Sequence, residues 1–432
     1  MKRLSILLLT LSILRSGHAQ NIDRTRLDSL FDNLAAHNLA LGDIAITQNG
    51  KPVYQRTVGK DQNPGATYRV GSISKVFTAT MIYELIDTKQ LSLDDTLGKF
   101  FPDVPNAGTI TIAELLGHRS GLANFTAEVT GFNHWKEQPH THEQLTGFIK
   151  SQPPDFVPGK KADYNNSNFL LLGYILEKIC HQSYKDLVTE RIIQKLGLRH
   201  TYYGDRAGFR SPEVPSFKYA DNQWKPENAV YLDNFGGAGA MISTPQDLCQ
   251  FITAIFKGKF IGMTSLARMT RIENDGYGWG MFSFGDSLHT GYGHSGQTEG
   301  FASSMRYFPK TGLAICYCTN GEVYPKDYIL DEVFGICFGE PVRIPTFIPV
   351  HLSKEQEQPL TGNYTGDNVP ELTCSLTNDS LSIGIKGQQF PLEALSDHEF
   401  RNVRFGFFFE FDPANKQLVV HDAATTYWLH RR

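Results

Sequence analysis

Apolar residues with helical spacing open the first patterned segment of the chain. In the stretch IDRTRLDSLFDNLAAHN, the residues Leu27, Leu30 and Leu34 recur every three or four positions, as on one face of an amphipathic helix. Two short alternating stretches follow on either side of Asn49-Gly50, a dipeptide preferred in two-residue hairpin turns. The pattern therefore predicts a helix followed by a β-hairpin.

The middle of the chain mixes longer helical patterns with short strands up to about residue 340. Helical periodicity covers residues 73–88, 167–181 and 244–257. Near the end of this region, SSMRYF and LAICYCTN alternate as two adjacent strands do. Because helices lie between strands at both ends, we predict an α+β or three-layer domain.

The pattern changes at Pro341. Residues 341–359 are rich in proline and then in polar residues, which is typical of a linker. Beyond them, the runs LTCSLT, LSIGI, FFFEF and LVVHD are separated by turn-forming residues, as in short antiparallel strands. We predict a main domain over residues 20–340, a linker over 341–359 and a small all-β domain, a meander or barrel, over 360–432.

The N-terminal residues 1–19 have a different character. Lys2 and Arg3 precede an apolar run from Leu4 to Leu14, and small residues follow up to Ala19. This is the pattern of a secretory signal peptide cleaved after Ala19, with a buried N-terminal helix as the alternative. Since the run is too short to span a bilayer, we expect a periplasmic or secreted protein without a transmembrane anchor.

Composition narrows the classes of function. The 432 residues are 41% hydrophobic and 20% charged, with a net charge of −4, as in ordinary soluble globular proteins. The basic residues form no long run, so we expect no nucleic-acid partner. The six cysteines are scattered without paired C-x-x-C spacing, so we expect no zinc site. The pattern leaves the oligomeric state and any cysteine pairing open.

A serine and a lysine three residues apart mark the start of the helical stretch at 73–88. In YRVGSISKVFTATMIYELI, Ser72 lies just before the helix, and Lys75 can reach it from the same face. A serine hydroxyl becomes a good nucleophile when a base takes its proton, and lysine can do this if its pKa is lowered. Backbone N–H groups at the helix start can bind an oxyanion. By itself, the pair is better explained as a helix-capping serine and a solvated lysine.

A second stretch of sequence favours the catalytic interpretation of Ser72 and Lys75 over the structural one. FVPGKKADYNNSNFLLLGYILEKIC contains Pro158-Gly159, then Tyr164-Asn165-Asn166, then Leu172-Gly173. It resembles the central segment of the serine β-lactamase and penicillin-binding protein superfamily, in the class C-like branch that includes D-stereospecific peptidases and esterases. ITIAELLGHRSGL and GGAGAMISTPQDLCQF are similar to two further segments of that family, and the resemblance covers roughly residues 22–335. It implies an α+β fold, β-lactamase/transpeptidase-like, with an antiparallel sheet flanked by helices.

The resemblance also implies roles for two residues of this stretch. Tyr164 would act as a base or proton relay if a cation such as Lys75 lowers its pKa from the usual value near 10. The Asn166 amide would hold a substrate amide or order Lys75. The structural alternatives are a core tyrosine with a satisfied hydroxyl and a capping asparagine.

Two tripeptides compete for the third motif of the family. His294-Ser295-Gly296 is followed closely by Gly300-Phe301, as the family's site strand is. Lys310-Thr311-Gly312 instead follows Pro309 and separates two alternating runs, as a hairpin turn does. Lys310 lies sixteen positions beyond His294. At ~3.3 Å per strand residue, the two tripeptides cannot serve one site, and we predict that Lys310-Thr311-Gly312 is a turn.

The resemblance then places His294 where other members carry lysine. There it would donate hydrogen bonds to the substrate or shuttle protons, with a charge that is conditional near pH 7. Ser295 and Gly296 would line the substrate, and the N–H groups of Ser72 and Gln297 would form the oxyanion hole. The alternative for His294 is a structural histidine at the end of a strand.

Together these features indicate an exported serine hydrolase that acts through an acyl-enzyme on Ser72. Its substrate would be a D-amino-acid peptide, a peptidoglycan fragment, a small ester or a β-lactam, with no metal or organic cofactor required. Lys75 and Tyr164 both remain candidates for the acylation base. The alternatives are a β-lactamase and a non-catalytic wall-peptide or partner-binding protein. The C-terminal domain resembles the lipocalin-like domains of some family members, and shapes substrate access or stabilises the fold.

Overall fold

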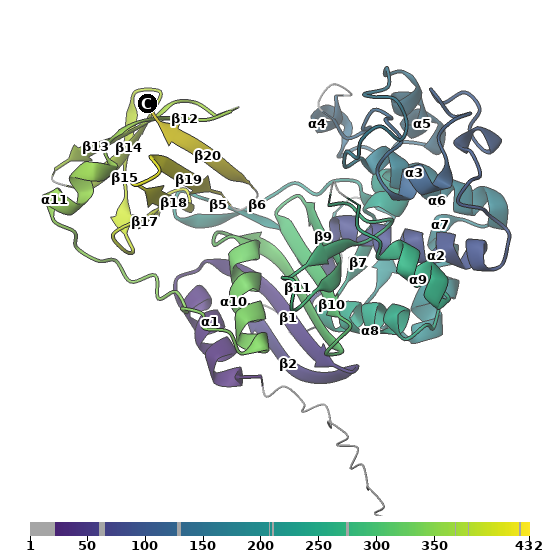
Figure 1. The fold of residues 1–432 in the computed structure, drawn as a ribbon, viewed down its shortest axis with the longest axis horizontal. Coiled ribbons are helices and arrows are strands. Elements are labelled where there is room, and N and C mark those ends of the chain that lie inside the picture. Colours follow the sequence, from purple (N-terminus) through teal and green to yellow (C-terminus); the bar gives the residue numbers. More distant parts are fainter. Residues whose placement is uncertain are drawn as a thin grey trace, which may run out of the picture.

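The computed structural model describes residues 22–432 except 60–64, 128–130, 207, 210, 274–275, 368, 379 and 423–424. The predicted signal peptide, residues 1–19 with cleavage after Ala19, lies outside the described residues. Figure 1 shows a larger α/β body and a smaller all-β body, joined by an extended segment after α10. This agrees with the predicted α+β, β-lactamase-like fold followed by a small all-β domain.

A six-stranded antiparallel sheet forms the centre of the larger body, with the order β2-β1-β11-β10-β9-β8. Its strands are β1 (Ala40–Gln48), β2 (Lys51–Val58), β8 (Phe282–Phe284), β9 (Gly291–Thr298), β10 (Phe301–Phe308) and β11 (Leu313–Glu322). The predicted hairpin is confirmed, since Asn49 and Gly50 connect β1 and β2 with positive φ at both residues.

Both faces of this sheet are covered. Helices α1 (Arg24–Ala36) and α10 (Lys326–Phe338) bury one face, which carries Ile315 and Tyr317. The opposite face carries Cys316 and Cys318 and packs against α8 (Pro245–Phe256) and the helices beyond it. The alternation predicted for LAICYCTN is therefore confirmed, and the larger body has three layers (Figure 1).

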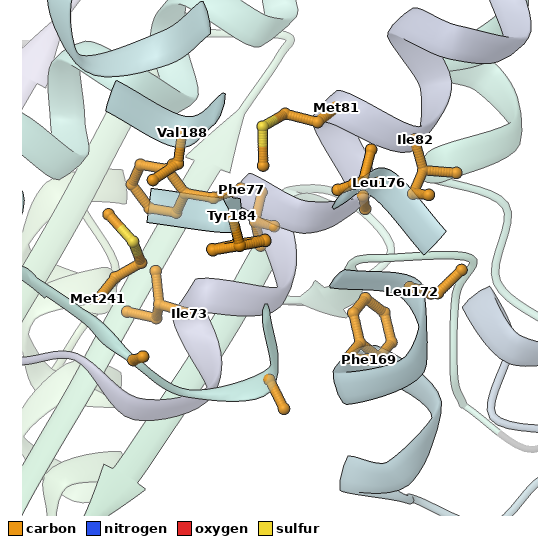
Figure 2. Close-up of a cluster of buried hydrophobic side chains, with 14 of the residues drawn as sticks. Ile73, Phe77, Met81, Ile82, Phe169, Leu172, Leu176, Tyr184, Val188 and Met241 are labelled. Carbon is orange, nitrogen blue, oxygen red and sulfur yellow. The ribbon is translucent and has the colours of Figure 1, made fainter. Parts of the chain in front are cut away.

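The three predicted long helices are present. α2 (Ser74–Asp87), α6 (Asn166–Cys180) and α8 match the stretches 73–88, 167–181 and 244–257. Figure 2 shows how Phe77 and Met81 of α2, and Phe169 and Leu176 of α6, lie in one apolar cluster. The Phe77 ring stacks on Phe251 of α8 with 3.9 Å between the ring centroids. This packing fixes the start of α2 relative to the start of α6.

Shorter elements complete the larger body. Its remaining helices are α3 (Ile112–Leu116), α4 (Phe132–Trp135), α5 (His142–Lys150), α7 (Tyr184–Val188) and α9 (Met263–Met269). A small sheet pairs β3 (Tyr68–Arg69) and β4 (Tyr202–Tyr203) with β7 (Met241–Ser243). The hairpin of β5 (Phe217–Ala220) and β6 (Gln223–Pro226) reaches toward the smaller body (Figure 1), where the Arg404 side chain pairs with Asp221 at 3.1 Å.

The C-terminal body is a nine-stranded antiparallel meander that is nearly a closed barrel, because its first strand β12 pairs with its last strand β20. The strands are β12 (Gly362–Thr365), β13 (Leu372–Thr377), β14 (Ser380–Ile385), β15 (Gln388–Pro391), β16 (Glu393–Ala394), β17 (Glu399–Asn402), β18 (Phe407–Asp412), β19 (Gln417–His421) and β20 (Thr426–Arg431). A short helix, α11 (Lys354–Glu357), lies inside the segment 341–359 that we predicted as a linker, where Ser353 and Gln356 form a capping box.

All six cysteines lie among the described residues and are unpaired. Five of them are buried, and Cys180 at the end of α6 is partly exposed. None of the helices in the described part of the chain combines the length and apolar character that a membrane span requires.

Candidate active site

Ser72 lies at the middle of a 3-10 turn, Gly71–Ile73, that leads directly into α2. Every residue from Gly71 to Tyr83 is buried except Ser72. Gly71 has a φ of 48°, and a Cβ there would lie 2.8 Å from the backbone nitrogen of Gln297. Only glycine fits this close approach, which brings the turn holding Ser72 against β9.

Lys75 lies one helical turn after Ser72 and is fully buried. Its Nζ is 2.9 Å from Ser72 Oγ, 2.8 Å from Asn166 Oδ1 and 2.8 Å from the carbonyl oxygen of Ala238. Burial holds the pKa of Lys75 well below its usual value. A neutral amine has two hydrogens and one lone pair. Since the two carbonyl oxygens can only accept, they take the hydrogens, and the lone pair faces the Ser72 hydroxyl.

Tyr164 immediately precedes Asn165, the residue that caps α6. Its hydroxyl is buried and makes no hydrogen bond of normal geometry with the described residues. Its interaction with Ser72 lowers the pKa of Tyr164, but by less than burial raises it. Burial raises the pKa of Tyr164, so the predicted lowering by Lys75 is wrong. The physical reason is burial of the phenol, which penalises its charged form even though Lys75 Nζ lies 4.9 Å from the centre of the Tyr164 ring. Tyr164 therefore keeps its proton at neutral pH.

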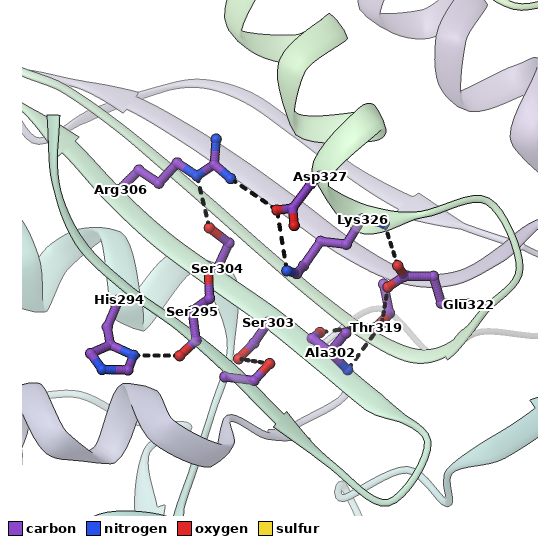
Figure 3. Close-up of polar contacts among 11 residues, drawn as sticks. His294, Ser295, Ala302, Ser303, Ser304, Arg306, Thr319, Glu322, Lys326 and Asp327 are labelled. Carbon is purple, nitrogen blue, oxygen red and sulfur yellow. Dashed lines mark hydrogen bonds and ion pairs between the residues drawn. The ribbon is translucent and has the colours of Figure 1, made fainter. Parts of the chain in front are cut away.

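His294 lies on β9 and is buried. Figure 3 shows its Nδ1 directed at the carbonyl oxygen of Ser295. Because a carbonyl only accepts, Nδ1 carries the hydrogen and Nε2 keeps a lone pair. Burial and then repulsion from Lys75 lower the pKa of His294 to about 3. The prediction of a conditional charge near pH 7 is therefore wrong, and neutral His294 has Nε2 free to act as an acceptor.

The backbone of β9 packs directly onto the residues before Ser72. A Cβ on Gly296 would lie 2.0 Å from the carbonyl oxygen of Val70, so this contact requires glycine. Ser303 of β10 donates a hydrogen bond to the same oxygen at 2.9 Å. Ser295 is partly exposed and Gln297 is exposed. The structure thus brings Gln297 beside the turn that holds Ser72, and its role in an oxyanion hole stays a prediction.

Asn166 is the first residue of α6 and completes the group around Ser72. Its Oδ1 accepts from Lys75, and its Nδ2 donates to Thr126 Oγ1 at 2.9 Å. The predicted ordering of Lys75 by Asn166 matches this geometry. Since both ends of the amide are occupied within the protein, Asn166 positions Lys75 and its free hydrogen-bonding capacity for a substrate is small.

Two residues near the site were not predicted from the sequence. His118 stacks on Tyr164 with 4.6 Å between ring centroids, and its Nδ1 accepts the N–H of Asn165 at 3.1 Å. Burial, Lys75 and His294 all lower its pKa. Its only signal in the sequence was its place in ITIAELLGHRSGL. Arg69 is 1% exposed, and its side chain bonds to Glu213 and Glu299, which are remote in sequence.

Lys310 lies away from this group. Lys310-Thr311-Gly312 forms the turn between β10 and β11, with a φ of 67° at Gly312. The Lys310 side chain is exposed and donates to the carbonyl of Leu288. The predicted turn is confirmed.

Comparisons with known proteins bear on this geometry. The Beta-lactamase family profile matches residues 27–335. Penicillin-binding protein 4* of Bacillus subtilis (strain 168) is 25% identical over 421 residues, which cover 88% of this chain and 91% of that protein. Teichoic acid D-alanine hydrolase of Staphylococcus aureus is 25% identical over 231 residues, which cover 52% of this chain and 56% of that protein.

Two solved structures extend the comparison. A D-stereospecific amidohydrolase from Streptomyces sp. is 27% identical with a TM-score of 0.64, covering 72% of this chain and 98% of that one. The octameric penicillin-binding protein homologue from Pyrococcus abyssi is 20% identical with a TM-score of 0.66, covering 94% of this chain and 99% of that one. The second likeness concerns the fold alone, and it extends over the C-terminal β body.

Proposed function

Because the chain belongs to the Beta-lactamase family, we propose that it is a serine hydrolase that cleaves an amide or ester through an acyl-enzyme on Ser72. The observation that carries this proposal is the arrangement of Lys75, which is buried, has a lowered pKa and lies 2.9 Å from the Ser72 hydroxyl. A solvated lysine or a helix-capping serine would need neither the burial nor the contact. A protein that only binds would have no use for this pairing.

Lys75 is the acylation base in this proposal. Ser72 Oγ attacks the carbonyl carbon, and its proton moves to the lone pair of Lys75 Nζ. The negative oxygen of the tetrahedral intermediate is bound by the N–H groups of Ser72 and Gln297. Tyr164 is then the general acid and not the base, since burial raises its pKa and keeps the proton on the phenol. It donates that proton to the leaving amine or alcohol and regains one from protonated Lys75.

Water completes the cycle by attacking the acyl-enzyme. Lys75, neutral again, accepts the proton of the water molecule, and the Ser72 oxygen leaves as its hydroxyl is restored. His294 Nε2 provides an acceptor at the β9 side of the site, where it orders the water or a substrate N–H. No step uses a charged histidine, consistent with the pKa of His294 near 3.

The charge of the site favours an uncharged substrate group next to the scissile bond. Lys75, His118 and His294 gather around Ser72, and burial lowers the pKa of all three, so none supplies a fixed positive charge. The carboxylate of a terminal D-amino acid or of a penicillin would gain no ion pair from them. We therefore propose amides and esters of D-amino acids as substrates. The names of the Streptomyces and Staphylococcus relatives support the D-configuration.

The domain limits 20–340, 341–359 and 360–432, and export directed by residues 1–19, are parts of the same proposal. A cavity of about 300 Å³ lies between the two bodies. Gln297 and Thr298 line it from β9, and Phe405 and Phe407 line it from the C-terminal body. This supports a role of the C-terminal body in shaping access to the β9 edge of the site.

A panel of substrates tests the proposal. The purified protein is incubated with D- and L-alanine p-nitroanilide, p-nitrophenyl acetate and benzylpenicillin, and product release and intact protein mass are followed together. We expect turnover of the D-amide and the ester, loss of both in Ser72→Ala, and full activity in Ser151→Ala, a matched exposed serine. Rapid penicillin hydrolysis would instead favour the β-lactamase alternative, and a lasting penicillin adduct a penicillin-binding enzyme of the cell wall.

The non-catalytic alternative predicts a different outcome. A binding protein would turn over none of these compounds, and Ser72→Ala would bind peptidoglycan fragments as tightly as the unchanged protein. That result would refute the proposed chemistry.

A further inference from the structure

A second cluster of ionisable side chains lies outside the group around Ser72. Asp286 and His289 belong to the loop between β8 and β9, and Glu340 directly follows the residue that caps α10. One ligand atom of each residue lies within 4.8 Å of the other two. We propose that these three side chains bind a divalent transition-metal ion of the Zn²⁺ class.

The distances at His289 fit an ion in this position. Its Nδ1 is 3.5 Å from Asp286 Oδ1 and 3.5 Å from Glu340 Oε1. An ion about 2.1 Å from each ligand atom in tetrahedral geometry places neighbouring ligand atoms about 3.4 Å apart. The two separations at His289 therefore already have the value that coordination requires. They are long for hydrogen bonds, which are best near 2.9 Å.

The ring nitrogen of His289 that faces the two carboxylates makes no hydrogen bond with the described residues. His289 Nδ1 is buried and has no hydrogen-bond partner among the described residues. In the neutral imidazole, a buried nitrogen that faces two carboxylates without a hydrogen bond is unfavourable, and a bound ion would remove that cost by accepting its lone pair. This observation is independent of the presence of the two acidic residues.

The three side chains are held in place by their surroundings. Asp286 Oδ1 accepts the N–H groups of Leu288 and His289, each at 2.7 Å. The His289 ring packs on Phe338 with 4.2 Å between centroids. The backbone N–H of Glu340 donates to the carbonyl of Gly335 at 2.8 Å. Such supporting contacts pre-organise metal ligands.

The donor set selects the kind of ion. Two carboxylates balance the charge of a divalent cation, and an imidazole favours Zn²⁺ or a similar ion over Mg²⁺ and Ca²⁺, which prefer oxygen ligands. Asp286 is exposed, which gives the ion a route from solvent and leaves room for water as the fourth ligand. The expectation of no zinc site rested on cysteine spacing, and this set contains no cysteine.

The bound ion would join two parts of the chain that are remote in sequence and already pack together through His289 and Phe338. The loop with Asp286 and His289 leads into β9, the strand that carries His294. Glu340 follows Gly339, the residue that caps α10, and precedes the segment that leads to the C-terminal body. The ion would therefore fix the start of β9 to the end of α10, independently of the chemistry at Ser72.

Metal binding to the full-length protein without an affinity tag tests this proposal. After chelator treatment and dialysis, Zn²⁺ is titrated by calorimetry, and Co²⁺ is used as a spectroscopic probe of the coordination. We expect one Zn²⁺ per chain, a tetrahedral Co²⁺ spectrum, and affinity weakened about 10-fold or more in His289→Ala and in Glu340→Gln. His142→Ala is the control, since His142 also lies beside a glutamate, with its Nδ1 3.3 Å from Glu177.

Several outcomes would overturn the proposal: no binding, binding that both variants retain, equal loss in His142→Ala, or equal affinity for Mg²⁺. In these cases His289 would be a surface histidine paired with carboxylates only. Circular dichroism establishes that the variants fold, and Glu340→Gln, at a partly exposed residue, preserves the test if His289→Ala does not. Ser72→Ala should bind Zn²⁺ unchanged, so failure of the proposed hydrolase chemistry would not affect this result.

Discussion

Replacing Arg69 by methionine tests whether a buried ion network holds the nucleophile turn and β9 together. Arg69 lies two residues before Gly71, and its guanidinium Nε donates to Glu213 Oε1 at 2.7 Å while Nη1 donates to Glu299. Glu299 follows Gln297 closely, in the turn between β9 and β10. The side chains of Arg69, Glu213 and Glu299 are 1%, 1% and 6% exposed. Methionine has a similar volume and no charge, so it removes the Arg69 cation from beside two buried carboxylates.

The expected loss in the free energy of unfolding is large. Removing one partner of a buried ion pair costs about 3–5 kcal/mol, because the remaining charge stays buried. Since Arg69 serves two buried carboxylates, we expect Arg69→Met to lose about 5 kcal/mol, the upper end of that range, near neutral pH.

The loss should also depend on pH. Burial already raises the pKa of Glu299 in the presence of Arg69, and removal of the cation raises it further. Between the unfolded value of about 4.3 and the raised folded value, the folded state binds a proton that the unfolded state does not. Stability therefore falls as the pH rises through this window, and the deficit of Arg69→Met should be smaller at about pH 5 than at about pH 8.

Urea unfolding followed by tryptophan fluorescence at both pH values measures these quantities. The triple variant Arg69→Met, Glu213→Gln, Glu299→Gln has no buried charge at this position and should recover most of the lost stability. A loss below about 1 kcal/mol, or a triple variant no more stable than Arg69→Met, would refute the reasoning.

Three further predictions concern the site. Activity should fall as the pH drops through the lowered pKa of Lys75, because the protonated amine cannot accept a proton, and Lys75→Met should reduce kcat by about 10²–10⁴-fold. Gly296→Ala places a Cβ 2.0 Å from the carbonyl oxygen of Val70, so we expect kcat/KM to fall about 100-fold. An unchanged kcat/KM would contradict this prediction and would mean that β9 moves away from Val70 without harm to the site. Lys310→Ala should keep kcat/KM within about twofold, while His294→Ala should lower kcat/KM about 100-fold. The opposite ranking would mean that Lys310-Thr311-Gly312, and not His294-Ser295-Gly296, is the third motif of the site.

Local sequence patterns predicted the elements that carry the site. The spacing of apolar residues predicted the positions of α2, α6 and α8 to within about two residues, because all three helices pack into the core. The hairpin at Asn49-Gly50 and the turn at Lys310-Thr311-Gly312 followed from residues that tolerate positive φ or fix a bend. The resemblance identified Ser72 and Lys75 at the start of α2, Tyr164 just before α6, and His294, which the structure places on β9.

The charge states of the site residues could not be predicted from the sequence. The pKa of Tyr164 rises and that of His294 falls because both groups are buried beside Lys75, and burial depends on segments far apart in the chain. The same holds for Arg69, whose partners lie 144 and 230 positions away. His118 lies in a segment that we used only as a family marker. Its stacking on Tyr164 becomes visible once α6 is placed.

The distribution of the six thiols has a practical consequence for experiments in solution. Five are enclosed in the core, while Cys180 ends α6 in a partly exposed position, so a maleimide dye should attach at this position in the native protein. At 1.5 Å per helical residue, the dye would sit about 21 Å along α6 from Asn166, which contacts Lys75. The native sequence thus offers a labelling position for fluorescence studies of ligand entry, remote enough to leave the chemistry at Ser72 undisturbed.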